Sequence, residues 1–562
     1  MTPVVGTRDL VEAAVSAAMA QALPAGSAGG DPLVRRSEHA DFQSNVALSL
    51  AREAGRSPRD LATSIATSIG AALDSGLSAT VAGPGFLNLT LPDATVWAQV
   101  SRRLAADRLG VATPRAGERI VVDYSAFNIA REPHVGHLRT TVIGDALVRI
   151  LRYLGAQVVP QNHLGDWGTQ FGMLVQFLME HPDHGDAPYP AARALFDADP
   201  AFADRSRARV VALQAGDPAT LAVWRRLVEE SEATFQQVYE RLGVLLTPAD
   251  SAGESTYNPM LRDVVDELVA KGIAVPSNGA LCVFFPDLTG PDGAPVPLIV
   301  RKDDGGFGYA ATDLAAVRYR IQRLRADRIL YVVDARQALH FRMVFETARR
   351  AGWLPGGRAV HVPFGTVLAA DGRPFRTRAG GTVALLDLLD EAETKAREVM
   401  ADRADPALVR QVSTGAVKYA ELSTSRLKDY AFDVDRMVSL TGNTGVYLQY
   451  AHARIRSILA KAPGVPTVDT ALPVHPAERA LALALDEFAD ILDQVARTLE
   501  PHHLCGYLYA LARTFTSFYE NVPVLKAETA AARDNRLALC LLAARTVEKG
   551  LNLLGIEAPP RM

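Results

Sequence analysis

The chain has 562 residues, a formal net charge of −4 and three cysteines. Its length predicts roughly three or more domains, and its charge excludes a globally basic nucleic-acid-binding protein, so RNA would have to bind a local patch. The widely spaced cysteines argue against a disulfide framework or a structural zinc site. Because no uncharged apolar run could cross a bilayer and the N-terminus is a poor signal peptide, we expect a cytoplasmic protein with no membrane partner.

Residues 1–112 are predicted to form a separate N-terminal α/β domain. A helical start is followed by a break rich in glycine, serine and proline at 24–32, a second helical stretch at about 58–73, and a turn and strand at 81–89. These residues alone leave two roles open, a stabilising cap for the rest of the chain or a contact with a partner.

A strand, loop, helix and second strand follow. Apolar residues 120–122 predict a buried strand, the apolar spacing of 140–154 predicts a helix, and 157–160 predict another strand. Alternation of strands with helices continues over 113–385, which indicates a doubly wound parallel sheet. The helical, polar segment at about 182–246 interrupts this rhythm and is interpreted as an insertion.

Two histidines and a glycine stand where that first helix begins. Free N–H groups and the helix dipole favour an anion there, His134 and His137 could donate to phosphate oxygens, and Gly136 permits close backbone approach. This is where a parallel α/β sheet holds ATP. Two alternatives stay open at this point: a capping or core role, and zinc, although no acidic third ligand follows at protease spacing.

Beyond residue 385 the pattern becomes almost entirely helical. We expect a connector over 386–440 and a helical bundle over 441–562. The clearest helical spacing of apolar residues lies at 481–499 and 537–554.

Several sequence blocks carry a resemblance to a known family. His134-Val135-Gly136-His137 resembles the HIGH motif of the class I aminoacyl-tRNA synthetases, and its neighbours resemble arginyl-tRNA synthetase. The resemblance runs from about residue 30 to residue 562. The blocks that carry it lie at 122–128, 134–139, 162–172, 253–260, 308–315 and 331–337.

The resemblance implies a Rossmann-type catalytic core, an N-terminal domain that contacts the outer corner of tRNA, and a C-terminal bundle that binds the anticodon. It implies an arginine–tRNA ligase, which makes arginyl-adenylate from L-arginine and ATP and then esterifies the terminal adenosine of the tRNA for arginine. Mg²⁺ would accompany ATP, held by phosphates and water rather than by a metal site of the protein. The family expectation is a monomer that needs tRNA before adenylation, with no DNA partner.

The resemblance also assigns residues to the nucleotide. Cationic side chains near the phosphates have to stabilise the charge that builds up there. A loop at 371–382 resembles the KMSKS-equivalent loop, and its alternative interpretation is a solvated basic turn. The implied catalytic residues are His134, His137, Arg131, Arg373, Arg376 and Arg378, and the implied ATP-binding residues are His134, Gly136, His137, Gly365 and Arg376.

Four positions depart from the commoner family pattern. Many relatives have lysine where this chain has Arg131, Arg373 and Arg376, and proline where it has Phe127. Arginine keeps the positive charge without the compact ammonium geometry, so we expect an effect on rate rather than on reaction type.

A pocket for arginine is implied by residues that could surround a planar cation with five donors. By resemblance it is lined by Asp123, Ser125, Asn128, Glu254, Tyr309, Asp313 and Gln337. A lysine or a citrulline would leave acceptors unmatched in such a pocket. Taken singly, each acid could equally be a surface charge or a helix cap.

Aromatic and basic residues of the bundle are the expected tRNA contacts, because tyrosine can stack on splayed bases and arginine can pair with phosphate. By resemblance these are Asn443, Tyr447, Tyr450, Arg454, Tyr519 and Met562. Aromatic residues on a bundle helix can also be core. Two other functions stay open: a ligase that joins an amino acid to a small amine, and a duplicated relative with reduced catalysis or a role in resistance to an arginine analogue.

Overall fold

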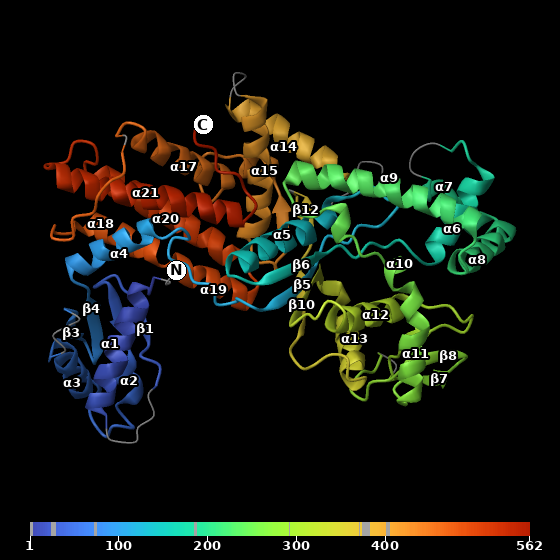
Figure 1. Ribbon diagram of the computed structural model, residues 1–562, viewed down its shortest axis with the longest axis horizontal. Helices are drawn as coiled ribbons and strands as arrows, with labels where there is room; N and C mark the ends of the chain where they lie inside the picture. The colour runs from blue at the N-terminus through green and yellow to red at the C-terminus, as the bar shows by residue number, and fades with distance from the viewer. Residues whose placement is uncertain are drawn as a thin grey trace.

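A parallel sheet forms the centre of the protein. The computed structural model describes residues 4–23, 30–71, 76–184, 188–290, 293–369, 371–373, 383–400, 405–462 and 464–562. Its four central strands run parallel in the order β11-β10-β5-β6 (Figure 1). They are β5 (Arg119–Asp123), β6 (Gln157–Gln161), β10 (Arg328–Asp334) and β11 (Ala359–Phe364). The predicted parallel sheet is therefore confirmed.

Both faces of this sheet are buried, which explains why its strands are continuous apolar runs. Successive side chains of a strand point to opposite faces: Ile120 and Val122 lie in one hydrophobic core, and Val121 lies in the other. The first core contains α5 (Leu138–Tyr153). The second contains α11 (Leu261–Ala270), α12 (Tyr309–Gln322) and α13 (Ala338–Arg350). Layers on both faces hold the strand ends rigidly in place.

A second, antiparallel sheet interrupts the expected alternation of strands and helices. It has the order β7-β8-β9, with β7 (Val275–Ser277), β8 (Ala280–Val283) and β9 (Leu298–Arg301). Its residues Val283, Leu298 and Val300 share the core of α11 to α13. The sequence prediction did not separate this sheet from the parallel one, because three or four apolar residues in a row fit either kind of strand.

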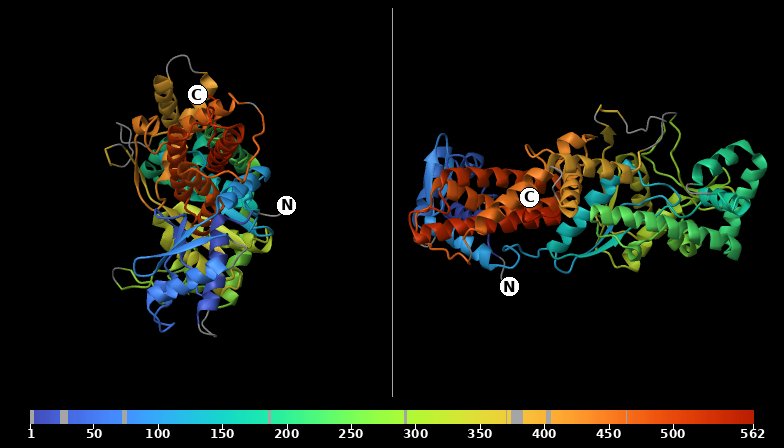
Figure 2. Two further views of the ribbon diagram at one scale, coloured as in Figure 1. Left: turned by 90° about the vertical axis from the view of Figure 1, so that its left-hand side faces the viewer. Right: turned by 90° about the horizontal axis from the view of Figure 1, so that it is seen from above.

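The segment interpreted as an insertion contains α7 (Tyr189–Ala198), α8 (Pro200–Gln214) and α9 (Pro218–Leu242), and α6 (Thr169–Glu180) precedes it. Helix α9 has clear end signals: the Asp217 side chain accepts from the Thr220 N–H at 2.9 Å, and Gly243 ends the helix with φ of 59°. Helices α6 to α8 lie at one end of the long axis (Figures 1 and 2). The region built on the parallel sheet therefore carries a helical extension on that side.

The N-terminal region lies at the other end of the long axis, beside the C-terminal helices (Figure 2). Its antiparallel sheet has the order β1-β2-β4-β3. The stretch predicted as one turn and strand at 81–89 belongs to a hairpin, because β3 ends and β4 begins within it. The elements are α1 (Thr7–Ala22), β1 (Val34–Arg36), β2 (Phe42–Ser44), α2 (Val46–Leu50), α3 (Pro58–Ala71), β3 (Ser78–Ala82) and β4 (Phe86–Thr90), followed by α4 (Asp93–Ala105).

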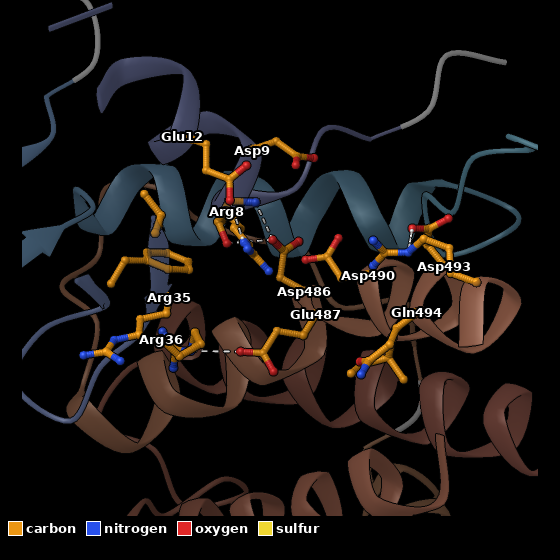
Figure 3. Close-up of a pocket in the computed structure, with 15 residues that line it drawn as sticks. Arg8, Asp9, Glu12, Arg35, Arg36, Asp486, Glu487, Asp490, Asp493 and Gln494 are labelled. Carbon is orange, nitrogen blue, oxygen red and sulfur yellow. Dashed lines mark hydrogen bonds and ion pairs between the residues drawn. The ribbon is translucent and has the colours of Figure 1, made fainter. Parts of the chain in front are cut away.

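A buried polar network joins this region to the bundle. Asp486 accepts from the N–H and hydroxyl of Thr7 at 2.5 and 2.7 Å and from Gln99 Nε2 at 2.8 Å, and it pairs with Arg103. The Arg103 and Asp486 side chains are 2% and 4% exposed. Beside the network lies a cavity of about 420 Å³, lined by both acids and arginines (Figure 3). The N-terminal region is thus fixed to the bundle rather than to the parallel sheet.

The C-terminal region is helical except for β13 (Tyr430–Phe432), which pairs in parallel with β12 (Val367–Ala369). The stretch 481–499, where the sequence shows helical apolar spacing, belongs to two helices that meet at Glu487. No helix in the described ranges is long and apolar enough to cross a membrane. The helices are α14 (Leu385–Met400), α15 (Pro406–Ser423), α16 (Val434–Met437), α17 (Gly445–Leu459), α18 (Pro476–Asp486), α19 (Phe488–Thr498), α20 (His502–Asn521) and α21 (Ala530–Leu553).

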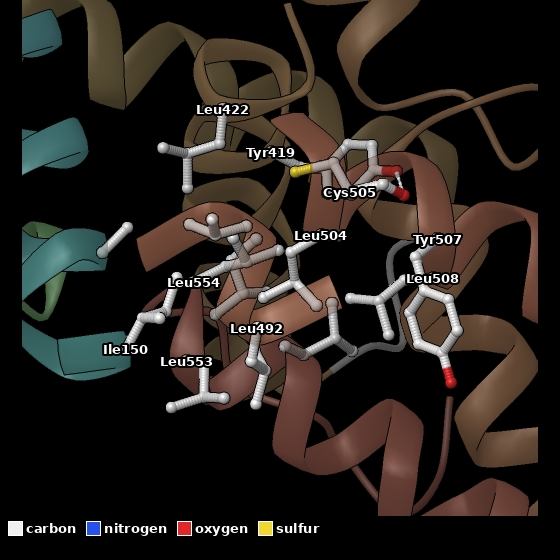
Figure 4. Packing of buried hydrophobic residues seen from close by; sticks show 14 of the residues in the cluster. Ile150, Tyr419, Leu422, Leu492, Leu504, Cys505, Tyr507, Leu508, Leu553 and Leu554 are labelled. Atoms are coloured by element: carbon white, nitrogen blue, oxygen red, sulfur yellow. Dashed lines mark hydrogen bonds between the residues drawn. The ribbon is translucent and has the colours of Figure 1, made fainter. Parts of the chain in front are cut away.

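Helix α5 of the sheet packs directly on this bundle. Ile150 of α5 lies in one core with Leu492 of α19 and Leu553 of α21, and all three are almost fully buried (Figure 4). The helix that begins at the histidine motif is therefore part of a continuous core with the C-terminal region. The domain boundaries predicted at residues 112, 385 and 440 stay predictions.

Candidate active site

The predicted site residues gather at the carboxyl ends of the parallel strands, where ligands bind in open α/β sheets. The loop after β5 has a backbone that side chains rarely adopt: φ is 76° at Ser125, 52° at Ala126 and 57° at Ala130. The Ala126 N–H donates to Asn162 Oδ1 at 2.9 Å, and the Ala130 N–H donates to Ser231 Oγ at 2.9 Å. Such strain persists only where the surroundings hold it, and it concentrates at functional sites.

The rings of the two histidines lie against each other, tilted by 35°, at the start of α5. Their ring centroids are 3.9 Å apart. His134 Nδ1 accepts from the Gly136 N–H at 3.1 Å, and His137 Nδ1 accepts from the His134 N–H at 3.2 Å. Because an Nδ1 that accepts carries no hydrogen, the neutral rings carry theirs on Nε2. Each ring therefore offers one N–H to a ligand.

The pKa values of both histidines are lowered, which favours their uncharged forms. Burial, the other histidine and Arg131 lower the pKa of His137 to about 3, and burial and Arg131 lower the pKa of His134. The zinc alternative lacks a third ligand here, because the one cluster of three possible ligands in the described ranges is Glu500, His502 and His503. The pair is thus built to donate hydrogen bonds to an anion.

Phe127, one of the departures from the family pattern, supports His137. It is fully buried, its ring lies 4.9 Å from that of His137, and it meets Phe235 of α9 edge to face at 4.9 Å. A large ring here fills the space behind the imidazole. The substitution therefore contributes packing to the site.

A group of carboxylates surrounds the buried side chain of Glu254. Glu254, at the start of α10 (Glu254–Tyr257), is 8% exposed. Burial, Asp313 and Asp166 raise the pKa of Glu254 to about 8. No ion pair with a lysine or arginine is formed by Glu254 in the described part of the chain. A buried acid that is pushed toward its neutral form by two other acids is a place where a cation would be bound strongly.

Asp313 is held by histidines rather than by arginine. Its Oδ2 lies 2.6 Å from His340 Nε2, and its Oδ1 lies 4.0 Å from His163 Nε2. Tyr309, one turn earlier on α12, is 67% exposed and forms the rim. Asp313 therefore keeps an oxygen that is not used by the imidazole of His340.

Asp123 differs from the other two acids, because the protein already supplies its cation. Its Oδ2 lies 2.8 Å from Arg320 Nη1, and the two side chains are 6% and 0% exposed. Arg320 also donates to Gln161 Oε1 at 3.0 Å. Asp123 thus has one oxygen committed to the fold, and a contact with arginine would have to use the other.

The remaining residues assigned to the arginine pocket lie at different depths. The Ser125 hydroxyl is buried and lies 2.8 Å from that of Tyr239. Asn128 is half-buried and bridges to Gly165, whose missing Cβ leaves room for the Asn128 Oδ1. Gln337 is exposed in the short helix η4 (Ala335–Gln337). Ser125 thus supports the loop, while Gln337 is free to face a ligand.

The residues assigned to the cationic loop are only partly described. Gly365 follows β11, and its N–H donates to the Arg426 carbonyl at 2.8 Å. Arg373 is exposed in a turn with Asp371. Beyond the loop, the Val135 N–H donates to the Val383 carbonyl at 3.3 Å, so this end lies against the histidine motif. Arg376 and Arg378 lie outside the described residues.

Arg131 lies 4.0 Å over the ring of Tyr189, which begins α7. This contact attaches the helical extension to the loop before the histidines.

The residues assigned to tRNA differ in how far they are exposed on the bundle. Tyr450 on α17 is 47% exposed and Met562 is 36% exposed. Arg454, one turn after Tyr450, lies 5.2 Å over the ring of Tyr519 on α20. Tyr447 is half-buried against Tyr509, and the side chain of Asn443 accepts from the Tyr419 hydroxyl. Tyr450 and Arg454 are therefore the more accessible members, and Tyr447 is partly core.

Three residues that shape the site were not singled out from the sequence: His163, Arg320 and His340. Arg320 is seven residues after Asp313 on α12, and His340 is three after Gln337. Both spacings place the pairs on one helix face and could have been noticed. His163 lies within a block already quoted for the family, but its contact with Asp313 joins two distant segments.

Comparisons with known proteins agree along the whole chain. An arginyl tRNA synthetase N-terminal domain matches residues 9–91, the class I (R) tRNA synthetase catalytic domain matches 99–434, and the DALR anticodon-binding domain matches 448–562. The chain is 63% identical to the arginine–tRNA ligase of Frankia casuarinae over 98% of both chains. It is 53% identical to that of Thermobifida fusca over 95% of both.

Solved structures agree with the sequence matches. The crystal structure of arginyl-tRNA synthetase from Plasmodium falciparum superposes with a TM-score of 0.81 at 26% identity and covers 100% of both chains. That of Thermus thermophilus gives 0.79 at 25% identity over 99% of this chain and 100% of the other.

Proposed function

The chain belongs to the arginyl-tRNA synthetase family, and we propose that the site at its sheet edge activates L-arginine with ATP and then esterifies the tRNA for arginine. The predicted family, fold class and enzyme class are confirmed by these matches. The roles of individual residues follow here as proposals.

The observation that carries the choice of substrate is the buried group of Glu254, Asp313 and Asp166. Burial, and then the neighbouring carboxylates of Asp313 and Asp166, raise the pKa of Glu254 to about 8. A guanidinium offers a planar set of donors and a permanent positive charge, so it can satisfy more than one carboxylate. Citrulline has the same shape without the charge, and lysine concentrates its charge at one point.

The neutral His134 and His137 would donate their Nε2 hydrogens to the phosphates of ATP, which is a substrate of the reaction. Their lowered pKa values keep both rings uncharged, so they act as directed donors rather than as point charges. Positive charge would come from arginines, Arg131 among them. Mg²⁺ would arrive with ATP and would be held by its phosphates and by water.

The chemistry asked of the protein is positioning. The arginine carboxylate attacks the α-phosphorus of ATP, the bond to the bridging oxygen breaks, and pyrophosphate leaves. The hydroxyl of the terminal adenosine of tRNA then attacks the activated carbonyl, and AMP leaves. Holding reactants in line contributes much of such an acceleration, and donors aimed at the phosphates contribute the rest.

The accessible Tyr450 and Arg454 are the proposed anticodon contacts, and the N-terminal region is the proposed contact for the outer corner of tRNA. A monomer in the cytoplasm stays our expectation, which size-exclusion chromatography with light scattering would test. The amine-ligase alternative requires a small acceptor in place of tRNA.

The test is arginine-dependent exchange of pyrophosphate into ATP, with and without tRNA for arginine. Lysine and citrulline serve as matched amino acids. We expect exchange with arginine alone among the three, and charging of tRNA. Exchange that does not depend on which amino acid is present would contradict the proposal. So would the absence of any exchange from protein shown to be folded.

A further inference from the structure

Two buried ion pairs join α5, the helix that begins at the histidines, to α15. Arg139 Nε lies 2.6 Å from Glu421 Oε1, and the side chains are 1% and 0% exposed. One turn and a half further along α5, Asp145 Oδ2 lies 3.6 Å from Lys418 Nζ, and both are 0% exposed. Removing such charges from water is expensive, and apolar residues of similar volume are often at least as stabilising. A role other than stability is therefore worth seeking for each pair.

The first pair reaches the opposite side of the nucleotide site. Besides Glu421, Arg139 holds the carbonyl of Lys428, to which its Nη1 donates at 2.8 Å. The next residue, Asp429, accepts from the Thr366 N–H at 2.6 Å. A Cβ on Gly365 would lie only 2.6 Å from Asp429 Oδ1. The segment around Lys428 therefore forms the direct support of Gly365 and Thr366, which follow β11.

The second pair contacts a different part of the molecule. Lys418 Nζ donates to the Leu242 carbonyl at 2.8 Å, and Asp145 Oδ1 accepts from the Leu245 N–H at 2.9 Å. These partners belong to the end of α9 and the residues that follow it. The two pairs thus share helices, burial and charge, but only the first connects to the strand end beside the histidines.

We propose that Arg139 is a positioning residue, which with Glu421 sets the spacing between the His134–His137 pair and the Gly365–Thr366 edge. This inference rests on the proposed function, in which ATP lies between these two sides. Only Leu138 separates Arg139 from His137, so the Arg139 guanidinium holds the first turn of α5. A guanidinium can hold a carboxylate and a carbonyl at once because it has five donors in a fixed plane. An apolar side chain would fill the volume but would release the Lys428 carbonyl.

The test separates positioning from stability. In the double variant Arg139→Met/Glu421→Met, no buried charge is left unpaired, so we expect a melting temperature near that of the wild type. If the pair positions the site, kcat for arginine-dependent pyrophosphate exchange falls roughly 100-fold, as a displacement of about 1 Å can produce. The KM for arginine should stay unchanged, because Glu254 and Asp313 do not contact this pair.

The matched control is Asp145→Asn/Lys418→Met, which neutralises the second pair on the same two helices and keeps an acceptor for Leu245. It should keep the wild-type kcat. A folded Arg139→Met/Glu421→Met variant with wild-type kcat would overturn the proposal, as would equal losses in both double variants.

If the first double variant does not fold, Arg139→Lys tests the positioning role instead, because a lysine side chain cannot contact Glu421 and the Lys428 carbonyl at the same time. A fall in kcat with unchanged KM for arginine is then expected, and a wild-type kcat would contradict the positioning role. Wild-type protein without arginine-dependent exchange would instead refute the proposed function, and these variants would then be compared by melting temperature alone.

Discussion

Two regions of this protein bury carboxylates, and they differ in whether the fold supplies a partner. Between the N-terminal region and the bundle, Asp486 is surrounded by Arg103, Gln99 and Thr7. In the catalytic region, Glu254 has acids as its electrostatic neighbours, and its pKa rises to about 8. A buried acid with its own cation contributes to the structure, whereas one without a cation is prepared for a charged ligand. Asp123, which pairs with Arg320, belongs with Asp486 on this criterion.

The largest expected effect comes from removing the charge of Glu254. Glu254→Gln should lower kcat/KM for arginine about 1000-fold, because the buried guanidinium loses a charged partner. The melting temperature should stay the same or rise, since the wild-type acid is buried without a cation. Steady-state pyrophosphate exchange and calorimetry measure the two. A large fall in the melting temperature would show that Glu254, like Asp486, stabilises the fold, and it would contradict the comparison.

Asp486→Asn should show the opposite pattern. It leaves the buried Arg103 guanidinium without its charge partner, which costs about 3–5 kcal/mol. Scanning calorimetry should show earlier unfolding, while the KM for arginine at 25 °C stays at the wild-type value. An arginine KM that rises as strongly as in Glu254→Gln would show that the network is not merely structural.

The raised pKa of Glu254 predicts a pH dependence. Below about pH 8 the free protein holds a proton on Glu254, and the guanidinium has to displace it. The KM for arginine should therefore fall as the pH rises from about 6 to 8, by up to about tenfold per pH unit. Glu254→Gln should abolish this slope. His137 should not contribute in this range, since its pKa is lowered to about 3.

The ionisation of Glu254 should strengthen arginine binding as the pH rises, but it should lower the free energy of unfolding of the free protein. A folded pKa above the unfolded value of 4.5 means that the folded state binds the proton more tightly. The contribution of Glu254 to stability is thus fully present below pH 4.5 and is lost as the pH rises through about 8. Arginine should raise the melting temperature more at pH 8 than at pH 6.

The smallest effect is expected at the exposed face of the bundle. Tyr450→Ala should raise the KM for tRNA roughly tenfold, in line with the loss of one stacked base, and should leave the KM for arginine unchanged. Tyr450→Phe keeps the ring and should behave as the wild type. Charging assays measure both variants, and an equal loss in Tyr450→Phe would contradict stacking.

The sequence alone was sufficient for features that depend on local pattern. The histidine motif, the parallel sheet and the helical bundle follow from apolar spacing and from helix-start chemistry, and the structure agrees with them. The apolar spacing at 481–499 did not reveal the boundary between α18 and α19, because it continues through Glu487. The antiparallel sheet at 275–301 was missed because its strands are short.

Side-chain partners that are far apart in the sequence could not be predicted from it, and the reason is physical. Asp123 and Glu254 are both acids in family blocks, and nothing local distinguishes the one that meets Arg320 from the one that lacks a cation. The Arg139–Glu421 pair joins residues 282 positions apart and leaves no periodic signal. Partner identity depends on how the sheet and bundle pack, which only the structure shows.

The most direct test of the central claim is the number of protons released when arginine binds. Isothermal titration calorimetry at pH 7, in two buffers of different ionisation enthalpy, measures this number. With a pKa of about 8 in the free protein, Glu254 should release close to one proton per arginine bound, and Glu254→Gln should release none. Arginine binding without proton release in the wild type, or citrulline binding as tight as arginine binding, would contradict the account.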